Sequence, residues 1–466
     1  DTDQGRYVPG AEEYIINSLA WLGITFDEGP HLGGSDAPYR QSERKANYKQ
    51  YAEQLVKDGF AYYAFDTNEE VNEMRKRLEA SKMMPKYDAV SRASMCNSLT
   101  LPQEEVEKRL KNDEEYVIRI KLPRNEEVRF HDEIRGWVVV NTTQMDDKVL
   151  MKSDGMPTYH LANIVDDHQM KITHVIRGEE WLPSAPLHVL LYKYLGWEDT
   201  MPVFAHLPLL LKPDGNGKLS KRDGDRLGFP VFPLEWKDPK TEEISSGYRE
   251  KGYLPEAVLN MLVLLGWHTA DNREIFTLDE LVEAFDLSRV SKSGAKFDIQ
   301  KAHWFNNHYI GKLDNATLAS ALENTVKEKY PAFPLANLPA ALELTKEKAV
   351  FMQDCINDAP FLFEAPNHYD EGVVAKKWNS EVAADMENIS TLFANTSDFN
   401  ETQLDQVVEE YAKENGNKKF FYFQPLRLVL TGKAGGPPLF KIMEFLGKEE
   451  TVSRIKNSIQ QISISV

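Results

Sequence analysis

The segment from Pro157 to about residue 226 constrains the fold most, because helical and strand patterns alternate along it. Apolar residues at helical spacing in MPTYHLANIVDDH precede the β-rich run KITHVIRG, which Gly178 ends. A second apolar helix, SAPLHVLLYKYLG, is expected to have Ser184 as its cap and Gly196 as its stop, and VFAHLPLLL follows as a buried strand. This order predicts a right-handed crossover between parallel strands, with Pro157 in the first turn of its helix. We therefore expect an α/β fold.

The rest of the chain is long enough for further domains. At 466 residues it exceeds what one hydrophobic core supports, so two to four domains are expected. Two helices come first, AEEYIINSLAWLG ending at Gly23 and NYKQYAEQLVKDG ending at Gly59. Charged helices (NEEVNEMRKRLEA, PQEEVEKRLKN) then mix with short strands (YVIRIKL, WVVVNT), which indicates an α+β insertion. Beyond about residue 230 the pattern is mostly helical.

Composition excludes several classes of protein. The longest apolar runs, such as VLLYKYLGW and LNMLVLLGW, are too short to span a bilayer, and no secretion signal is recognisable. With only Cys96 and Cys355, neither a disulfide framework nor a zinc site of cysteine pairs is expected, and a reducing cytoplasm is the natural location. A net charge of −18 argues against a nonspecific coat for nucleic acid, but it leaves a specific RNA-binding face open.

One such face lies between Asn415 and Met443, a stretch that contains no Asp or Glu. Its cations surround the aromatic run FFYF, and aromatic side chains beside cations can stack nucleic-acid bases. The alternative is that FFYF is a buried strand with solvated lysines around it, and the pattern alone favours this alternative. The cations are Lys418, Lys419, Arg427, Lys433 and Lys441.

Arg177 stands at the carboxyl end of the strand KITHVIRG, where ligands bind in open parallel sheets. Tyr159 and Asn163 are four residues apart on the preceding helix and project from one face of it. Close to Arg177, they would complete a hydroxyl, an amide and a bidentate cation, a set that suits a small ligand with carboxylates and an ammonium group. A salt bridge between Arg177 and a neighbouring carboxylate is an equally open interpretation.

A second cationic motif, KLSKR, occupies residues 218–222 and follows the strand HLPLLL through the turn-rich segment PDGNG. Flexible lysines on a glycine-rich loop at the end of a strand can hold a triphosphate and stabilise the charge on a departing pyrophosphate. In isolation the motif would be interpreted as a solvated basic loop. Its position after this sheet favours phosphate binding.

These motifs carry a specific resemblance. KLSKR resembles the KMSKS signature of class I aminoacyl-tRNA synthetases, in the form typical of the glutamyl enzymes. TYHLANIVDDHQMKITHVIRGEEWLPSAPLH is similar to the central block of that family. Further family blocks follow in family order between Asp1 and Phe440, namely DTDQGRYVPGAEEYI, YRQSERKANYKQYAEQL, FHDEIRGW, YLPEAVLNMLVLLGW and LRLVLTGKAGGPPLF. The chain thus resembles a bacterial-type glutamyl-tRNA synthetase over nearly its whole length.

The resemblance implies a domain order. A Rossmann-type catalytic domain would be split into residues 1–63 and 156–226 by an acceptor-stem-binding insertion at 64–155. A connecting, stem-contact domain would follow at 227–310, and then two helical anticodon-binding subdomains at 311–370 and 371–466. The helical carboxyl end separates the chain from glutaminyl-tRNA synthetase, whose anticodon region is a β-barrel.

The resemblance also implies a reaction, ATP-dependent ligation of L-glutamate to tRNA(Glu) through glutamyl-adenylate. Its partners would be tRNA(Glu), L-glutamate and ATP with Mg²⁺. The enzyme would be a cytoplasmic monomer that binds no membrane and holds no metal ion through protein side chains. Lys218 and Lys221 match the catalytic signature lysines. Tyr159, Asn163 and Arg177 match the glutamate-binding positions. The ATP-binding positions would be Glu180, the backbone at Leu210, Lys218, Ser220 and Lys221, and tRNA would contact Arg427 and Lys433.

Three departures from the family pattern carry expectations of their own. The family's HIGH signature precedes the DTD block, so we expect the native protein to extend a few tens of residues before Asp1. Only Cys96 lies where some relatives hold zinc, so no zinc is expected. The segment GFPVFPLEWKDPKTEEISS is longer than expected and is interpreted as a surface insertion. A truncated chain or an inactive tRNA-binding relative is the alternative, although Tyr159, Arg177 and Lys221 are all present.

Overall fold

The computed structural model describes residues 2, 5, 7–220, 223–224, 226 and 228–465. They form two compact units, which are described separately. The first comprises residues 1–245 and 262–297, and the second comprises residues 246–261 and 298–466.

A four-stranded sheet in the order β4-β3-β7-β6 organises the first unit. The strands β6 (His174–Gly178) and β7 (Val203–Leu207) run parallel, and α6 (Ala185–Tyr194) connects them. The parallel crossover predicted from the sequence is therefore confirmed. On the other side of β7, β3 (Glu127–Asp132) pairs with it in parallel, and β4 (Gly136–Asn141) pairs with β3 antiparallel.

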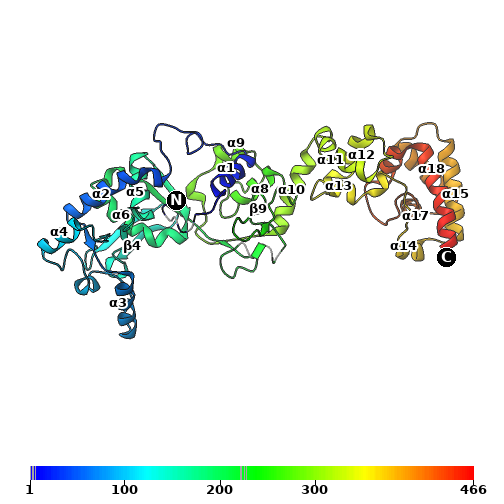
Figure 1. Ribbon diagram of the computed structural model, residues 1–466. Helices are drawn as coiled ribbons and strands as arrows, with labels where there is room; N and C mark the ends of the chain where they lie inside the picture. The colour runs from blue at the N-terminus through cyan, green and yellow to red at the C-terminus, as the bar shows by residue number, and fades with distance from the viewer. Residues whose placement is uncertain are drawn as a thin grey trace. The chain divides into compact units, whose positions relative to one another are not determined.

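Helices packed beside this sheet form the main hydrophobic core of the unit. Figure 1 shows α2 (Lys45–Lys57), α5 (Tyr159–Gln169) and α6 close together, with α5 in contact with both of the others. The helical spacing seen in the sequence therefore marks buried faces. Burying each large apolar side chain contributes about 1.5–3 kcal/mol to folding. Fully buried members of this core include Leu55, Leu161, Val165, Leu191 and Tyr192.

The structure corrects three local details. Pro157 lies before the helix and bridges to Met151, because Thr158 is the N-cap of α5. Ser184 has helical backbone angles and makes no capping hydrogen bond, since the 3₁₀ helix η5 (Glu179–Ser184) leads directly into α6. The expected strand VFAHLPLLL is divided at Pro208, which has no N–H to donate. Its second half, β8 (Leu210–Leu211), pairs instead with β11 (Ala295–Lys296).

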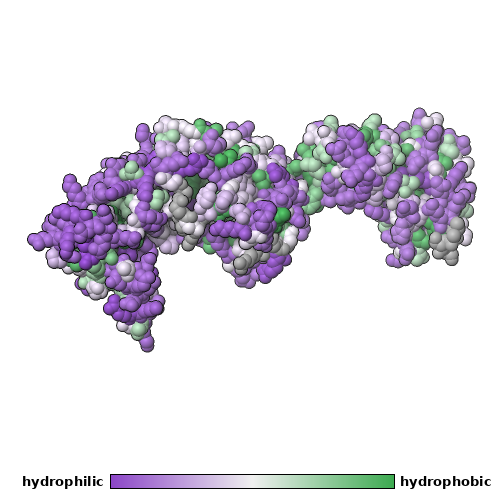
Figure 2. Space-filling model, viewed as in Figure 1, coloured by the Kyte–Doolittle hydropathy of each residue, from purple (hydrophilic) through white to green (hydrophobic). Residues whose placement is uncertain are grey.

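The sequence region interpreted as an insertion contributes to two sheets. The strands β1 (Ala61–Ala64), β2 (Val117–Ile120) and β5 (Val149–Met151) form a sheet of their own. By contrast, β3 and β4 from the same region belong to the sheet of β6 and β7. The predicted helices are α3 (Asn68–Ala80) and α4 (Gln103–Lys111), and hydrophilic residues predominate over both in Figure 2.

The long segment after KLSKR packs against α1 (Ala11–Trp21). The Tyr14 hydroxyl donates to the Leu234 carbonyl at 2.7 Å and accepts from the Leu234 amide at 3.2 Å. The Tyr14 ring also lies 5.0 Å from that of Trp236. Leu234 and Phe229 are buried, so the interpretation as a surface insertion is only partly right. The remaining elements of the unit are β9 (Trp236–Lys237), β10 (Ile244–Ser245), α9 (Leu278–Ala284) and the short helices η2 (Gln41–Arg44), η3 (Ser91–Ser94), η4 (Thr142–Gln144), η6 (Glu198–Thr200) and η7 (Leu287–Arg289).

The second unit is helical in its described residues, which confirms the predicted pattern there, whereas residues 230–297 also contain β9, β10 and β11. The alternative that FFYF is a buried strand is wrong, because the run opens the helix α17 (Phe420–Thr431). Tyr422, Leu426 and Val429 recur at helical spacing and are fully buried, whereas Phe420 is 69% exposed. The helices are α8 (Pro255–Val263, whose end crosses into the first unit), α10 (Ile299–Lys312), α11 (Asn315–Lys329), α12 (Leu338–Glu343), α13 (Asp354–Asn357), α14 (Glu371–Lys377), α15 (Ser380–Asn395), α16 (Glu401–Glu414), α17 (Phe420–Thr431), α18 (Leu439–Ser465, interrupted at Gly447), η8 (Leu335–Asn337), η9 (Lys346–Lys348) and η10 (Pro360–Leu362).

Within the part of the chain that the structure describes, every helix is too short or too polar to cross a membrane.

Candidate active site

Arg177 lies where three strands of the main sheet end. It is next to the last residue of β6, and the strand register places it opposite His206 of β7. Asp132 is the last residue of β3, which pairs with the other edge of β7. The parallel arrangement therefore gathers a cation, an imidazole and a carboxylate at the carboxyl ends of neighbouring strands, where ligands bind in sheets of this type.

The half-buried guanidinium of Arg177 contacts only neutral acceptors. Its Nε donates to Nε2 of His206 at 3.1 Å, its Nη1 to the hydroxyl of Tyr159 at 3.3 Å, and its Nη2 to Nδ1 of His188 at 3.3 Å. Among the described residues, no carboxylate forms an ion pair with it. The salt-bridge interpretation left open by the sequence is therefore not what these residues form.

Tyr159 and Asn163 stand one turn apart on α5 but make different contacts. The Tyr159 ring packs against Trp181 with centroids 4.5 Å apart, and both line a cavity of about 400 Å³. Asn163 donates from Nδ2 to Oδ2 of Asp167 at 3.2 Å rather than contacting Arg177. Its buried Oδ1 has no hydrogen-bond partner among the described residues, so it is an available acceptor.

Four polar residues that sequence reasoning did not single out form two pairs, and one member of each pair accepts a hydrogen bond from Arg177. Asp132 and His206 are fully buried, and Oδ2 of Asp132 lies 2.6 Å from Nδ1 of His206. On the other side, Nε2 of fully buried His188 lies 3.1 Å from Nδ1 of His160. The only available signal was a histidine inside the apolar runs VFAHLPLLL and SAPLHVLLYKYLG.

Burial explains the protonation of these groups. It lowers the pKa of His160 to about 4, with the nearby charges of Lys148 and Arg177 acting in the same direction. Burial also lowers the pKa of His188 well below its usual value, again with help from Arg177. For Asp132, burial opposes ionisation, but hydrogen bonds from His206 and from backbone amides prevail and lower its pKa. The two histidines are thus neutral acceptors at neutral pH, and Asp132 is a carboxylate.

The loop that carries KLSKR is tied to the same edge of the sheet. Nζ of Lys218 lies 2.7 Å from Oε1 of Glu180, so two predicted ATP-binding residues contact each other. The Leu219 amide donates to the carbonyl of Leu210 at 2.7 Å. Ser220 donates its hydroxyl to Asp223 at 2.5 Å. Two residues of the motif, including the predicted phosphate ligand Lys221, lie outside the described residues.

Comparisons with known proteins identify the family of the chain. Residues 1–304 match the family model described as tRNA synthetases class I (E and Q), catalytic domain, and residues 310–459 match an anticodon binding domain. The glutamate–tRNA ligase of Cytophaga hutchinsonii is 53% identical over all of this chain and 90% of its own length. That of Phocaeicola vulgatus is 53% identical over 99% of this chain and 90% of its own length.

The chain belongs to the glutamate–tRNA ligase family of class I tRNA synthetases. A solved member from Elizabethkingia meningosepticum, described as in complex with its amino acid, superimposes with a TM-score of 0.92 at 47% identity, covering 99% of this chain and 91% of that one. The enzyme from Elizabethkingia anophelis gives a TM-score of 0.90 at 48% identity, with the same coverage. The fold class, the helical carboxyl end and the enzyme class predicted from the sequence are confirmed.

Members of this class use ATP with Mg²⁺. Within the described residues, no group of three or more His, Cys, Asp and Glu side chains could hold a metal ion.

The two residues predicted to bind tRNA lie in the second unit. Arg427 on α17 donates from Nη1 to the carbonyl of Pro437 at 2.7 Å and, with Phe420 and Phe423, lines a cavity of about 540 Å³. Lys433 donates from Nζ to the carbonyl of Asp358 at 3.0 Å. Neither cation is paired with a carboxylate among the described residues.

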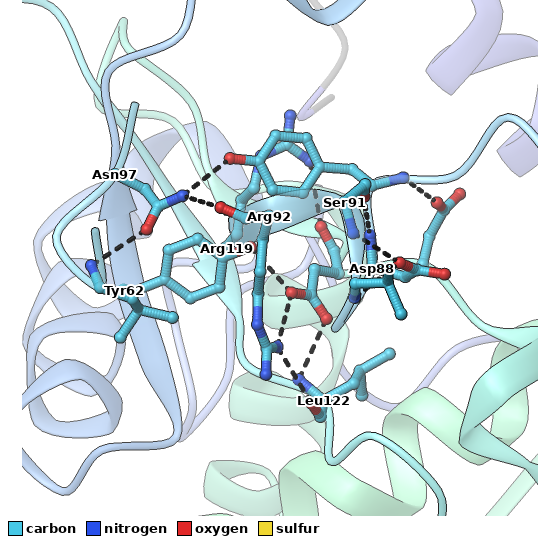
Figure 3. A network of polar contacts seen from close by, with 12 residues as sticks. Tyr62, Asp88, Ser91, Arg92, Asn97, Arg119 and Leu122 are labelled. Atoms are coloured by element: carbon cyan, nitrogen blue, oxygen red, sulfur yellow. Dashed lines mark hydrogen bonds and ion pairs between the residues drawn. The ribbon is translucent and has the colours of Figure 1, made fainter. Parts of the chain in front are cut away.

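A second polar cluster, shown in Figure 3, lies in the region predicted to bind the acceptor stem. Its centre is the fully buried Asp147, whose Oδ2 accepts from Nη1 of Arg92 at 2.9 Å and from the Tyr62 hydroxyl at 2.8 Å. Oδ1 accepts from the Leu122 amide at 3.1 Å. Arg119 donates to the carbonyl of Asp147 at 3.0 Å and stacks over Tyr87. We call the Arg92–Asp147 pair at its centre the closed cluster, because the two charges neutralise each other; Arg119 beside it has no carboxylate partner among the described residues.

Proposed function

We propose that this chain activates L-glutamate with ATP and transfers it to tRNA(Glu), with Arg177 binding a carboxylate of glutamate. The observation that carries this assignment is the guanidinium of Arg177, half-buried and held by three neutral acceptors. A desolvated cation without a counter-ion is costly, and an anionic ligand removes that cost.

The reaction takes place in two steps. The α-carboxylate of glutamate attacks the α-phosphorus of Mg-ATP, which forms glutamyl-adenylate and releases pyrophosphate. A hydroxyl of the terminal tRNA ribose then attacks the activated carbonyl, which forms the ester and releases AMP. Both steps depend on positioning and electrostatic stabilisation, so no protein nucleophile is needed.

The other site residues divide between the two small substrates. The Tyr159 hydroxyl and the available Oδ1 of Asn163 would accept hydrogen bonds from the glutamate ammonium group, which requires acceptors. Glu180 and the backbone of Leu210 would contact ATP, together with Lys218, Ser220 and Lys221 of the loop. The two lysines would stabilise negative charge on the departing pyrophosphate.

The second unit would bind tRNA(Glu) through Arg427 and Lys433. Exposed Phe420 beside Arg427 supports this assignment, because aromatic and cationic groups together suit a nucleotide. We further infer that the enzyme works as a monomer in the cytoplasm, where its product is consumed in translation. Both cysteines are free thiols, as a reducing compartment requires.

Arg177→Lys tests the assignment. An ammonium group cannot reproduce a bidentate pair, so the apparent KM for glutamate should rise roughly 10- to 100-fold, the worth of a charged hydrogen bond. The KM for ATP should stay within about twofold of the native value. Both KM values are measured by pyrophosphate exchange, and tRNA is added because its binding at remote contacts supports the chemistry. Arg92→Lys is the matched control, since Arg92 serves the closed cluster. Equal changes in both KM values would make Arg177 a structural residue.

A further inference from the structure

We propose that the pairs Asp132–His206 and His188–His160 are positioning residues, which orient the guanidinium of Arg177 by presenting one unprotonated imidazole nitrogen each. The inference rests on the proposed role of Arg177 in binding glutamate. It adds the mechanism by which the fold prepares that arginine for a carboxylate.

The tautomer of His206 follows from Asp132. An ionised carboxylate can only accept, so Nδ1 of His206, 2.6 Å from Oδ2, must carry the proton. In a neutral ring, Nε2 is then unprotonated and accepts from Nε of Arg177 at 3.1 Å. Asp132 thus acts on Arg177 through the imidazole without forming an ion pair with it.

The tautomer of His188 follows from Arg177 in the same way. Nδ1 of His188 faces an Nη2 that can only donate, so this nitrogen is unprotonated. The ring is neutral, so Nε2 carries the proton and donates to Nδ1 of His160 at 3.1 Å. Two hydrogen-bonded chains therefore meet at Arg177, one from β3 through β7 and the other from α5 through α6.

The two hydrogen-bonded chains leave two N–H groups of Arg177 free for a ligand. A guanidinium has five N–H donors, and His206, His188 and Tyr159 accept three of them. Within the described part of the chain, one N–H on Nη1 and one on Nη2 have no acceptor. We assign these two donors to the edge between Nη1 and Nη2, where two parallel N–H groups can engage a carboxylate in a bidentate pair. Because the acceptors are neutral, the full positive charge also remains for the ligand.

Asp132→Asn should reverse the first chain without changing its shape. Oδ1 of Asp132 accepts three backbone amides, from Ile134 at 3.0 Å, Arg135 at 2.9 Å and His206 at 3.3 Å. An asparagine must keep its oxygen there, so its NH₂ group would face Nδ1 of His206. The ring would then carry its proton on Nε2, directed at the N–H of Arg177, and two donors would oppose each other.

Variants of the second chain separate positioning from packing. His188→Leu removes the acceptor for Nη2, whereas His188→Asn keeps an oxygen near the position of Nδ1. We expect Asp132→Asn and His188→Leu each to raise the KM for glutamate roughly tenfold, which is the loss expected for one hydrogen bond to a charged group. The KM for ATP should stay within about twofold of the native value. His188→Asn should recover most of that loss. Folding is followed by thermal melting, and Asp147→Asn is the control for loss of a buried carboxylate elsewhere.

The outcomes are distinguishable. If Arg177→Lys raises the KM for glutamate but folded Asp132→Asn and His188→Leu do not, the positioning role is wrong and the proposed function stands. If Arg177→Lys leaves glutamate binding unchanged, the proposed function itself fails. If Asp132→Asn does not fold, the comparison of His188→Leu with His188→Asn tests the inference alone. The inference would be overturned if His188→Asn raised the KM for glutamate as much as a folded His188→Leu does.

Discussion

Arg92 and Arg177 belong to the same unit, yet their surroundings differ in one respect. Arg92 pairs with the buried carboxylate of Asp147, which also accepts from Tyr62 and from a backbone amide. Arg177 is surrounded by a phenol and two imidazoles, and the nearby carboxylate Asp132 reaches it only through His206. The Arg92–Asp147 pair is electrically closed, whereas Arg177 has no carboxylate paired with it among the described residues and is open.

This difference separates a structural cation from a binding cation. Desolvating an ion pair is tolerable when every partner is satisfied, and such a cluster has little to gain from a ligand. In an open cluster the cation has no counter-ion, so a carboxylate of the substrate stabilises it on binding. We expect closed clusters to respond to mutation mainly in stability and open clusters mainly in substrate binding.

Breaking the closed cluster should give the largest effect. Asp147→Ala would leave the half-buried Arg92 without a counter-ion, at a cost of about 3 kcal/mol in the free energy of unfolding, the lower end of the range for a buried pair. Urea denaturation of the native enzyme and the variant measures this. In the folded fraction, the KM for glutamate should stay unchanged. A loss below about 1 kcal/mol would mean that the cluster is not structural in this sense.

The lysines of the KLSKR motif extend the comparison to cations that are predicted to bind phosphate. Lys221→Ala in the native enzyme should cost roughly 3–4 kcal/mol of transition-state stabilisation, the range for a lost electrostatic donor. Folding should be nearly unchanged, because the role predicted for this lysine is to bind phosphate and not to pack in a core. Pyrophosphate exchange within about threefold of the native rate would show that Lys221 is not the phosphate ligand.

Two adjacent carboxyl groups repeat the contrast on α5. Asp166 pairs with Arg44 at 2.9 Å, whereas among the described residues the carboxyl group of Asp167 accepts a hydrogen bond only from Asn163. Burial, and then the charge of Asp166, raise the pKa of Asp167 to about 7. The folded state therefore holds this proton where the unfolded state has lost it, and the resulting stability declines as the pH rises from about 4 towards 7.

Asp167→Asn cannot ionise, so it sharpens that contrast. The free energy of unfolding of the variant, minus that of the native enzyme, should increase with pH between about pH 4 and 7. The increase should be at most about 1.4 kcal/mol per pH unit. Above pH 7 the difference should level off. Denaturation curves at several pH values measure it, and parallel profiles for both proteins would place the titration elsewhere.

Lys433→Ala should give the smallest effect, on tRNA alone. If Lys433 contacts a phosphate, its loss should weaken tRNA binding several-fold and reduce the slope of log K against log salt by about 1. Lys413 is the matched control in the same unit, because it is already paired with Glu409 at 2.8 Å. Equal effects of Lys413→Ala and Lys433→Ala would argue for a general electrostatic contribution.

The sequence predicted the elements that carry the open cluster better than the cluster itself. Apolar periodicity located α5, β6, α6 and β7, since buried faces have a regular spacing. It also brought Arg177 to the correct edge of the sheet. The support from Asp132 depends on the pairing of β3 with β7, which brings Asp132 to His206, 74 positions along the chain, and no local pattern encodes that pairing.

The errors have local physical causes. Pro208 divides an apolar run that looks continuous, because its missing N–H is invisible to hydropathy. FFYF has strand-like composition, but burial of Tyr422 and Leu426 on one face makes it helical. Whether Arg177 had a carboxylate partner could not be read from the sequence either, because Glu179 and Glu180 follow it closely. In the structure these pair with Arg135 and Lys218 instead.

A crystal structure of this enzyme with L-glutamate tests the central claim most directly. We expect one glutamate carboxylate to accept from both Nη1 and Nη2 of Arg177, while Nε remains on His206 and the Asp147 cluster is unchanged. Glutamate bound away from Arg177, or Arg177 turned towards a carboxylate of the protein, would contradict the distinction between open and closed clusters.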